Sequence, residues 1–342
     1  MFKYKFYSQL FAGFLIISTT FLSGCGIFNV KTKSKTPPLL KTENADKSAL
    51  LQKINHLAQV NSLRAKMDLK FEDNSFAESG IAEKYKSADG EVVVQRPSNI
   101  SLKVQIPIIK TDIAQMTSDG EKFRVAILED GAGGKYKKFL VGSNNADYKK
   151  LQEAVVQMDL KDGKEIQKNV NAFSNLRPQH FTEALLVRPT DDAHVYVRSE
   201  IYQDESDSTQ RKKSPAARVI RGYYFLDELT KADDGDLKIT RRFWFDRVGG
   251  IRLARQQIFD AQGEIESDIV YGKEGNLSDD PDYQNLPLEI EVTRPKEKYK
   301  MRLTYQSAES VSVGKTYKKE VFVLENRWNL PEVDLDKKAG GQ

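Results

Sequence analysis

The chain has 342 residues, of which 30% are charged and 10% aromatic, and it contains one cysteine. Its 53 lysines and arginines exceed its 49 aspartates and glutamates by only four, so no excess of positive charge favours a nucleic-acid partner. A single cysteine excludes an intramolecular disulfide and a cluster of thiolate metal ligands.

The first 24 residues have the order of a secretory signal. Lys3 and Lys5 precede an apolar run centred on residues 10–17, and small residues follow it. The run is shorter than a membrane-spanning helix, which needs about 20 apolar residues, and the hydroxyl residues 18–20 interrupt it. We therefore expect residues 1–24 to be removed as a signal peptide rather than kept as an anchor helix.

Residues 22–25 read Leu-Ser-Gly-Cys and end this segment. They resemble the lipobox of bacterial lipoproteins, in which the cysteine receives a diacylglyceryl group and the signal is cut on its amino side. The resemblance implies that Cys25 is lipidated and anchors the chain to a membrane. Because Gly26 rather than Asp follows, it also implies the outer membrane, with the domain facing the periplasm. The alternative is an ordinary cleaved signal in which Cys25 is an unmodified thiol.

Two further elements come before the first strand. Residues 25–46 are rich in Lys, Thr, Ser and Pro and offer few large apolar side chains to offset the entropy of ordering, which predicts a flexible tether. Apolar side chains then recur at helical spacing over residues 47–62 and predict one amphipathic helix. We interpret this helix as a core helix that packs on a sheet.

The spacing changes to period two after this helix. Residues 65–71 and 100–106 alternate apolar and polar side chains, which predicts strands with one buried and one solvated face. Asp-Gly pairs at 89–90, 119–120 and 130–131 predict the tight turns of an antiparallel meander.

Helical spacing returns near residues 147–187, and period-two alternation resumes after it, at 288–293 and 301–305. The prediction is an α+β protein: one domain over residues 47–336, with a helical insertion near 147–187 and a disordered tail at 337–342. Its core is an antiparallel curved sheet with helices covering the apolar face. Periodicity leaves open whether the sheet closes into a lipocalin-like barrel or stays an open half-barrel.

Three stretches carry a further resemblance. Residues 92–97 read Val-Val-Val-Gln-Arg-Pro and are followed at 117–123 by Thr-Ser-Asp-Gly-Glu-Lys-Phe; residues 243–246 read Phe-Trp-Phe-Asp. With residues 321–335 as a final strand and tail, they resemble the LolA/LolB-type carriers and receptors of outer-membrane lipoproteins. The resemblance covers about residues 47–335. It implies an open half-barrel with helices as a lid over an apolar cavity that takes lipid or lipoprotein acyl chains.

The resemblance also assigns residues. Arg96 matches the arginine that in the carrier holds the lid closed by hydrogen bonds to lid backbone, a task that suits the five donors of a guanidinium. The alternative for Arg96 is a surface arginine at a strand end. The expected cavity residues lie on apolar strand faces: Met67, Leu69, Leu102, Val104, Ile106, Val125 and Phe245.

Catalytic and metal chemistry have no support in the sequence. His56, His180 and His194 have no partner at metal-ligand spacing, and the chain has neither a Gly-x-Ser-x-Gly elbow nor a phosphate-binding glycine loop. We therefore expect no catalytic residue, no cofactor and no metal. Two functions stay open: binding of acyl chains in an apolar cavity, in lipoprotein or lipid transport, and a structural envelope lipoprotein with a filled core that binds another protein.

Overall fold

The computed structural model describes residues 36–73, 83–84, 88–129, 134, 137–144, 178–207, 218–232, 235–275, 286–296 and 299–339. The predicted signal peptide, Cys25 and residues 147–177 of the predicted insertion lie outside the described residues. The chain divides into a smaller unit, Met1–Leu39 with Asp204–Ile220, and a larger unit, Leu40–Gln203 with Arg221–Gln342. Within the smaller unit Leu39 pairs with Ile220 in a parallel bridge, and Arg218 forms an ion pair with Asp204.

The described strands form one sixteen-stranded sheet, which is antiparallel except where β16 pairs with β7 in parallel. The strands are β1 (Ser62–Asp73), β2 (Glu83–Lys84), β3 (Ala88–Gln95), β4 (Asn99–Gln105), β5 (Asp112–Asp119), β6 (Lys122–Ile127), β7 (Phe139–Ser143), β8 (Val195–Ser206), β9 (Arg218–Lys231), β10 (Leu237–Asp246), β11 (Arg252–Phe259), β12 (Ile265–Gly275), β13 (Leu286–Arg294), β14 (Tyr299–Tyr305), β15 (Ser312–Val313) and β16 (Glu332–Asp334).

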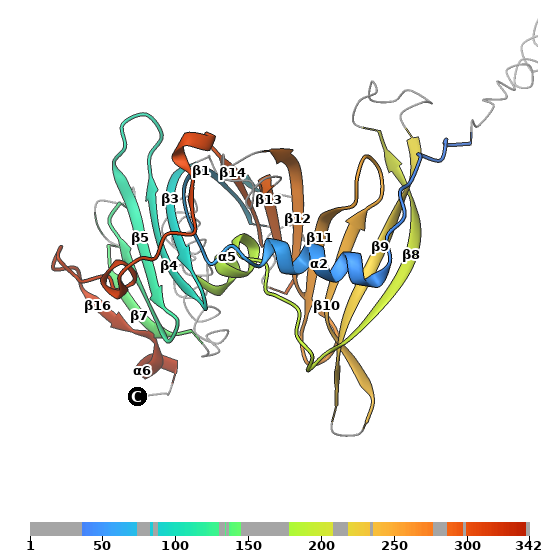
Figure 1. Cartoon of the computed structure of the whole chain (residues 1–342). Coiled ribbons are helices and arrows are strands. Elements are labelled where there is room, and N and C mark those ends of the chain that lie inside the picture. The colour runs from blue at the N-terminus through green and yellow to red at the C-terminus, as the bar shows by residue number, and fades with distance from the viewer. Residues whose placement is uncertain are drawn as a thin grey trace, which may run out of the picture. The chain divides into compact units, whose positions relative to one another are not determined.

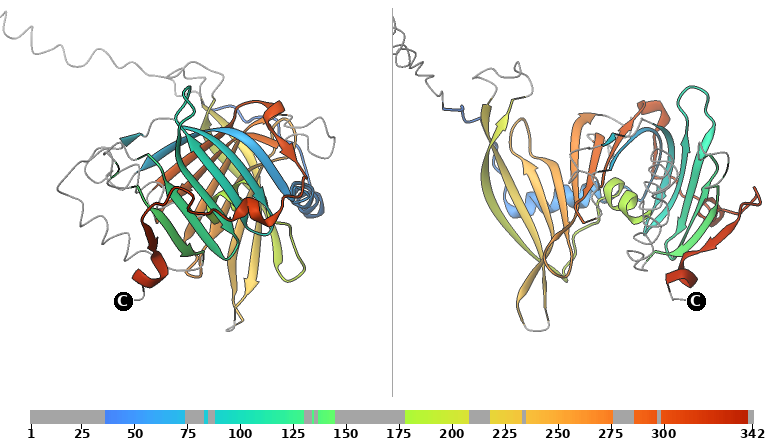
Figure 2. Two further views of the ribbon diagram at one scale, coloured as in Figure 1. Left: turned by 90° about the vertical axis from the view of Figure 1, so that its left-hand side faces the viewer. Right: turned by 180° about the vertical axis from the view of Figure 1, so that it is seen from behind.

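The strand order is β16-β7-β6-β5-β4-β3-β1-β14-β13-β12-β11-β10-β9-β8, with β2 and β15 attached to β1. The first and second halves of the chain therefore meet where β1 pairs with β14, with Met67 opposite Tyr305. Among the described strands β16 and β8 end this order without pairing with each other, so the sheet is open. Figures 1 and 2 show it as a strongly curved surface. The predicted curved antiparallel sheet is confirmed, and the open form is the one adopted.

Alternation of side chains places one face of the strands in the core. On β1, Ala65, Met67 and Leu69 are buried and Lys66 is exposed, as the period-two pattern predicts. The core continues across the sheet through β14, β13 and β12 to Phe243 of β10. The predicted alternation at 100–106 corresponds to β4, and that at 288–293 and 301–305 to β13 and β14.

Two helices precede or interrupt the strands on the concave side in Figure 1: α2 (Lys47–Leu57) and α5 (Pro178–Leu185). Asp46 caps α2 by accepting a hydrogen bond from the amide of Ala49 at 2.8 Å. Helix α2 contacts β11, and α5 contacts β3, β4, β5 and β13. The predicted helix over 47–62 is too long at its end, because the chain turns after Leu57 to begin β1 at Ser62.

The Asp-Gly pair at 89–90 is not a turn, which corrects the prediction. Gly90 lies inside β3 opposite Met67. A Cβ at this position would stand 2.7 Å from Cδ1 of Leu69, so the glycine makes room for a core leucine rather than a reversal of the chain. The predicted turn at Gly120 does have positive φ, and so do Gly249, Gly250 and Gly263, which lie between consecutive strands. The pair at 130–131 lies outside the described residues.

Three terminal stretches also differ from the predictions. Residues 43–45, predicted as part of a flexible tether, are held to the domain: Glu43 N donates to Arg247 O at 2.8 Å, and Nη2 of Arg247 donates to Asn44 Oδ1 at 2.8 Å. Residues 321–324, expected in a final strand, overlap the short 3₁₀ helix η5 (Lys319–Phe322), which buries Phe322.

The tail is ordered further than predicted. Residues 337–339 belong to α6 (Leu335–Ala339), because Asp336 accepts hydrogen bonds from N and Oγ of Ser143 on β7 at 3.1 and 2.8 Å. No helix within the described parts of the chain has the length and apolar character needed to cross a membrane.

Candidate ligand-binding site

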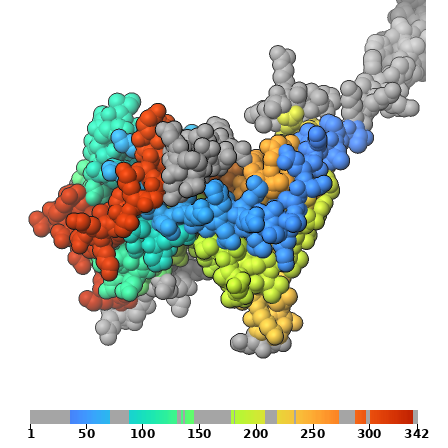
Figure 3. Space-filling view, viewed as in Figure 1, coloured from blue at the N-terminus to red at the C-terminus, as the bar shows by residue number. Residues whose placement is uncertain are grey.

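A pocket of about 540 Å³ lies between α2, the end of α5 and the strands β11–β14. This volume is within the range of about 300–1,000 Å³ typical of small-molecule sites. Figure 3 shows α2 in blue at the surface of the molecule, beside the yellow-green segment that contains α5. The apolar wall consists of Leu57, Val60, Leu63, Ala184, Leu185, Val187, Ile251, Leu253, Pro287 and Ile290.

Polar groups enter the pocket at two depths. Lys53 and His56 of α2 are exposed, and Arg252 of β11 is half-buried. Tyr271 of β12 is buried, and within the described part of the chain its hydroxyl has no hydrogen-bond partner. Burial raises the pKa of the Tyr271 phenol well above its ordinary value, so the group stays neutral and can donate a hydrogen bond.

Arg96 holds the chain directly after α5. It follows β3, and its Nη2 donates to the carbonyl of Val187 at 2.6 Å. Burial, together with the charge of Arg241, lowers the pKa of Arg96, and its buried Nε finds no hydrogen-bond partner in the residues that the structure describes. Val187 lines the pocket, so Arg96 fixes one wall of it. The resemblance implied a contact of this kind; the role of Arg96 as a lid contact stays a prediction.

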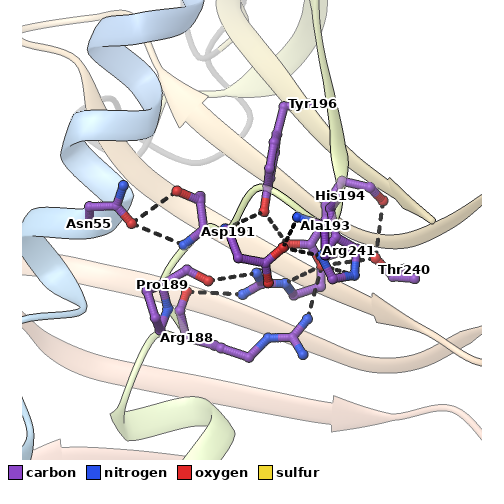
Figure 4. Close-up of polar contacts among 11 residues, drawn as sticks. Asn55, Arg188, Pro189, Asp191, Ala193, His194, Tyr196, Thr240 and Arg241 are labelled. Carbon is purple, nitrogen blue, oxygen red and sulfur yellow. Dashed lines mark hydrogen bonds and ion pairs between the residues drawn. The ribbon is translucent and has the colours of Figure 1, made fainter.

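A second arginine, which the sequence reasoning missed, holds the next two carbonyls. Nη1 of Arg241 donates to the carbonyl of Arg188 at 3.0 Å, and its Nη2 donates to that of Pro189 at 3.1 Å. Figure 4 shows these bonds converging on the segment between α5 and β8. Asn55 of α2 accepts from N and Oγ1 of Thr190, both at 3.0 Å. Residues 187–190, called the lid segment below, are thus tied to β3, β10 and α2.

Arg241 is positioned by the fully buried carboxylate of Glu228 on β9. Nε of Arg241 donates to Glu228 Oε1 at 2.8 Å, and Nη2 pairs with Oε2. Arg188, Tyr196 and Thr240 each donate to the same carboxylate at 2.9 Å.

Burial alone would raise the pKa of Glu228, but the hydrogen bonds and charge of Arg241, with hydrogen bonds from Thr240 and Tyr196, outweigh it and hold the pKa below its ordinary value. A buried pair of this kind costs desolvation, which several hydrogen bonds offset here.

Glu183 of α5 faces the same region. It is half-buried, and burial is the main cause that raises its pKa to about 7. The charge of Glu266 adds to the rise in pKa, while the charges of Arg294, Arg188 and Arg241 oppose it.

The seven predicted cavity residues lie elsewhere. Six of them are buried in the core, and Ile106 is half-buried just after β4; none lines the pocket. Helix α5 and η5 both contact β4 and β5, where Phe181 and Phe322 are fully buried. Helix α5 and η5 therefore lie against the two strands that carry Leu102 and Val104 or pair with them. A ligand-binding role for these seven residues stays a prediction.

A signal for the missed residues is present in the strands. Glu228 follows Leu226 at the next inward position of β9, and Arg241 precedes Phe243 in the same way on β10. Opposite charges at inward positions of two neighbouring strands indicate a buried pair. Among the described residues there is no group of three His, Cys, Asp or Glu side chains that could hold a metal ion.

Comparison with known proteins gives structural neighbours. No family model and no curated protein matches the sequence. Among solved structures, the chain is similar to a LolA superfamily protein from Nitrosomonas europaea, at 9% identity and a TM-score of 0.41 over 82% of this chain and 99% of that chain.

Two further structures are similar to the chain. A DUF1329 family protein from Desulfovibrio piger has 9% identity and a TM-score of 0.40 over 80% of this chain and 95% of that one. A domain described as an outer membrane lipoprotein-sorting protein, from Vibrio parahaemolyticus, has 8% identity and a TM-score of 0.38 over 80% and 94%. LolA is the family that the Arg-Pro and Ser-Asp-Gly motifs resemble. At these scores no activity or site residue is transferred from the neighbours to this chain.

Proposed function

We propose that this protein binds the acyl chain of a lipid or lipoprotein in the pocket between α2, α5 and β11–β14, and that α5 with the lid segment covers the bound chain. The pocket itself carries the proposal: apolar side chains of α2, α5 and the sheet form a continuous part of its wall beside a few polar groups, and one side of it is backbone held by side-chain hydrogen bonds rather than by a β-ladder. Such a wall can open when a few bonds break, whereas a strand in the sheet cannot.

The binding energy would come from burying hydrocarbon. Each methylene contributes about 0.8 kcal/mol, so ten contribute about 8 kcal/mol. Association costs of about 4–15 kcal/mol oppose this gain, so short chains should bind weakly and affinity should rise with chain length. The expected slope is about fourfold per methylene until the pocket is full.

The cellular setting is part of the proposal. We infer that Cys25 carries the acyl anchor and that the domain serves in lipid or lipoprotein transport or localisation at the outer membrane, facing the periplasm. The lipobox-like residues 22–25 behind a charged and apolar amino terminus support the anchor. In this setting the protein acts as a binding protein and not as an enzyme.

The test uses the mature chain, residues 25–342 with Cys25→Ser, so that no anchor lipid is attached. Amphiphiles that share one head group and carry 8 to about 14 carbons are titrated calorimetrically below their micelle concentrations. We expect the fourfold rise per methylene, ending at a limiting length. In Leu253→Trp, a half-buried pocket residue is enlarged, so the limit should move to a shorter chain.

The matched control is Ile258→Trp, because Ile258 is half-buried on the same strand but does not line the pocket. It should leave the limiting length unchanged. Absence of any dependence on chain length would refute the proposal.

One observation favours the second candidate, a structural envelope lipoprotein with a filled core. Six of the strand-face residues expected around an acyl cavity are packed in the protein core. If the pocket serves no ligand, the purified chain without its anchor should release no lipid on denaturation. Mass spectrometry of the native and the denatured mature Cys25→Ser chain distinguishes the two candidates.

A further inference from the structure

We infer that the pocket selects acyl lipids with a negatively charged head group, which Lys53, His56 and Arg252 receive at its open side while Tyr271 donates to the acyl carbonyl inside. This inference rests on the proposed acyl-chain binding and adds the class of ligand. It follows from which charged and hydrogen-bonding groups line the pocket and from the depth at which each one stands.

The charge of the lining has one sign. Lys53 and Arg252 bring positive charge to the pocket, His56 brings a hydrogen-bonding imidazole, and no described aspartate or glutamate lines it. Lys53 and His56 are three positions apart on α2, so their side chains share one face of the helix. Both are exposed, and the described residues give neither side chain a hydrogen bond or ion pair. They are available to an anion from solvent.

Arg252 completes this group from the sheet. It lies at the start of β11, and its Nη2 is 3.1 Å from Oδ2 of Asp246. The same carboxylate accepts from Arg221 at 2.6 Å, so two guanidinium groups share it. Glu289 stands across from Gly272 in the β12–β13 ladder. Asp246 and Glu289 are next to lining residues but do not themselves line the pocket.

Tyr271 supplies an independent sign of a polar ligand atom. Its side chain is 4% exposed and lines the pocket, and its hydroxyl has no hydrogen-bond partner among the described residues. Leaving a buried hydroxyl unpaired is unfavourable, so a site that keeps one is suited to a ligand acceptor. A hydrocarbon chain alone has no such acceptor, whereas an acyl ester has a carbonyl oxygen.

The depths of these groups match the order of atoms in an anionic acyl lipid. Exposed Lys53 and His56 come first, buried Tyr271 next, and apolar residues such as Leu63 and Ile290 form the rest of the wall. A lysophosphatidate has the same sequence of phosphate, ester carbonyl and hydrocarbon. A neutral monoacylglycerol has only the last two parts of that sequence.

The test compares three dodecanoyl esters that share the acyl chain and carbonyl: a lysophosphatidate, a monoacylglycerol and a choline ester, which is cationic. Binding to the mature Cys25→Ser chain is measured by calorimetry at low and high salt. Two or three partly exposed charges, each giving about two- to fivefold, predict that the lysophosphatidate binds about tenfold more tightly than the monoacylglycerol. The choline ester should bind most weakly, and the differences should shrink at high salt.

Lys53→Gln should reduce the preference for the lysophosphatidate about two- to fivefold and leave monoacylglycerol binding unchanged. Lys66→Gln is the control, since Lys66 is an exposed residue of β1 outside the pocket lining, and it should change neither. Tyr271→Phe should weaken the ester-linked lysophosphatidate but not its ether-linked analogue, which lacks the carbonyl. Thermal melting confirms that each variant is folded.

The outcomes separate the two proposals. Equal affinity for the three esters would overturn selection by charge and leave acyl-chain binding intact. Failure of all three to bind would overturn acyl-chain binding itself. Equal losses of ester and ether ligand in Tyr271→Phe would overturn the role given to its hydroxyl.

Discussion

Arg96→Met should loosen the lid segment without unfolding the domain. The substitution keeps an unbranched apolar stem but removes the guanidinium that donates to the carbonyl of Val187 at 2.6 Å. It also removes a charge whose burial is unfavourable, since burial and Arg241 together lower the pKa of Arg96 and its Nε has no partner. The two effects oppose each other in the free energy of global unfolding. Only the lost hydrogen bond affects the opening of the lid segment when the rest of the domain stays folded.

The size of the effect follows from the kind of bond. A hydrogen bond from a charged donor contributes about 1.5–3 kcal/mol. Each 1.4 kcal/mol is a factor of about ten in an equilibrium constant, so the open population of the lid segment should rise about ten- to hundredfold. The global free energy of unfolding should change by less than about 1 kcal/mol, because relief of the poorly satisfied charge offsets part of the loss.

Hydrogen exchange with mass spectrometry measures the opening directly. Peptides that cover residues 181–190 contain the amide of Leu186, which donates to Thr182 O at 2.9 Å, and should exchange faster in Arg96→Met. Peptides from β13 and β14 should be unchanged. Arg64→Met is the matched control, because Arg64 pairs with Glu91 on the exposed surface of β1 and β3. Unchanged exchange over residues 181–190 in Arg96→Met would refute the role given to Arg96.

Three further predictions concern stability. Leu69→Ala should lower the free energy of unfolding by about 2–5 kcal/mol, measured by urea titration, and leave amphiphile binding unchanged, because Leu69 is packed in the core; a small cost would instead indicate an open cavity beside it. Glu228→Gln should cost about 3–5 kcal/mol at pH 7, since it leaves Arg241 buried without its carboxylate. The folded pKa of Glu228 lies below its ordinary value, so this stabilisation is present at neutral pH and is lost as the pH falls through the folded pKa. The difference between wild type and variant should therefore shrink as the solution is made more acidic, and a difference that stays constant with pH would contradict the assignment. Glu183 gives the opposite dependence of stability on pH. Its folded pKa of about 7 lies above the ordinary value, so stability is lost as the pH rises toward and past 7. Glu183→Gln should therefore stabilise the protein by about 1–3 kcal/mol at pH 8 and have little effect at pH 4, as judged by thermal melting at both values.

Local patterns in the sequence predicted the strands because the alternation of apolar and polar side chains within a strand shows which of its faces is buried. Alternation over residues 65–71 places Met67 and Leu69 on one face whichever strand lies beside them. The same patterns failed at Gly90, where Asp-Gly has the composition of a turn. The glycine there is required by contact with Leu69, a residue 21 positions earlier, and no local rule detects such a contact.

Arg96 and the pocket also show the difference between what local patterns predict and what contacts between distant residues decide. The Arg-Pro motif singled out Arg96, but its acceptor, the carbonyl of Val187, is 91 residues away along the chain. The pocket combines residues of α2, α5 and four strands of the second half with Leu63 of β1, so strand faces of the first half account for little of its lining. Glu228 and Arg241 were recognisable only as charges at inward positions.

The amino-acid sequence by itself determined the period-two strands, their apolar faces and an amphipathic helix near residue 50, because these depend on side chains a few positions apart. Tertiary structure alone decided that the sheet stays open and that α5 and η5 pack against β4 and β5. It also decided that the remaining space lies against β11–β14. These outcomes depend on which faces meet across the sheet. That in turn depends on how side-chain volumes pack and which hydrogen-bonding groups pair, and both involve residues from distant parts of the chain.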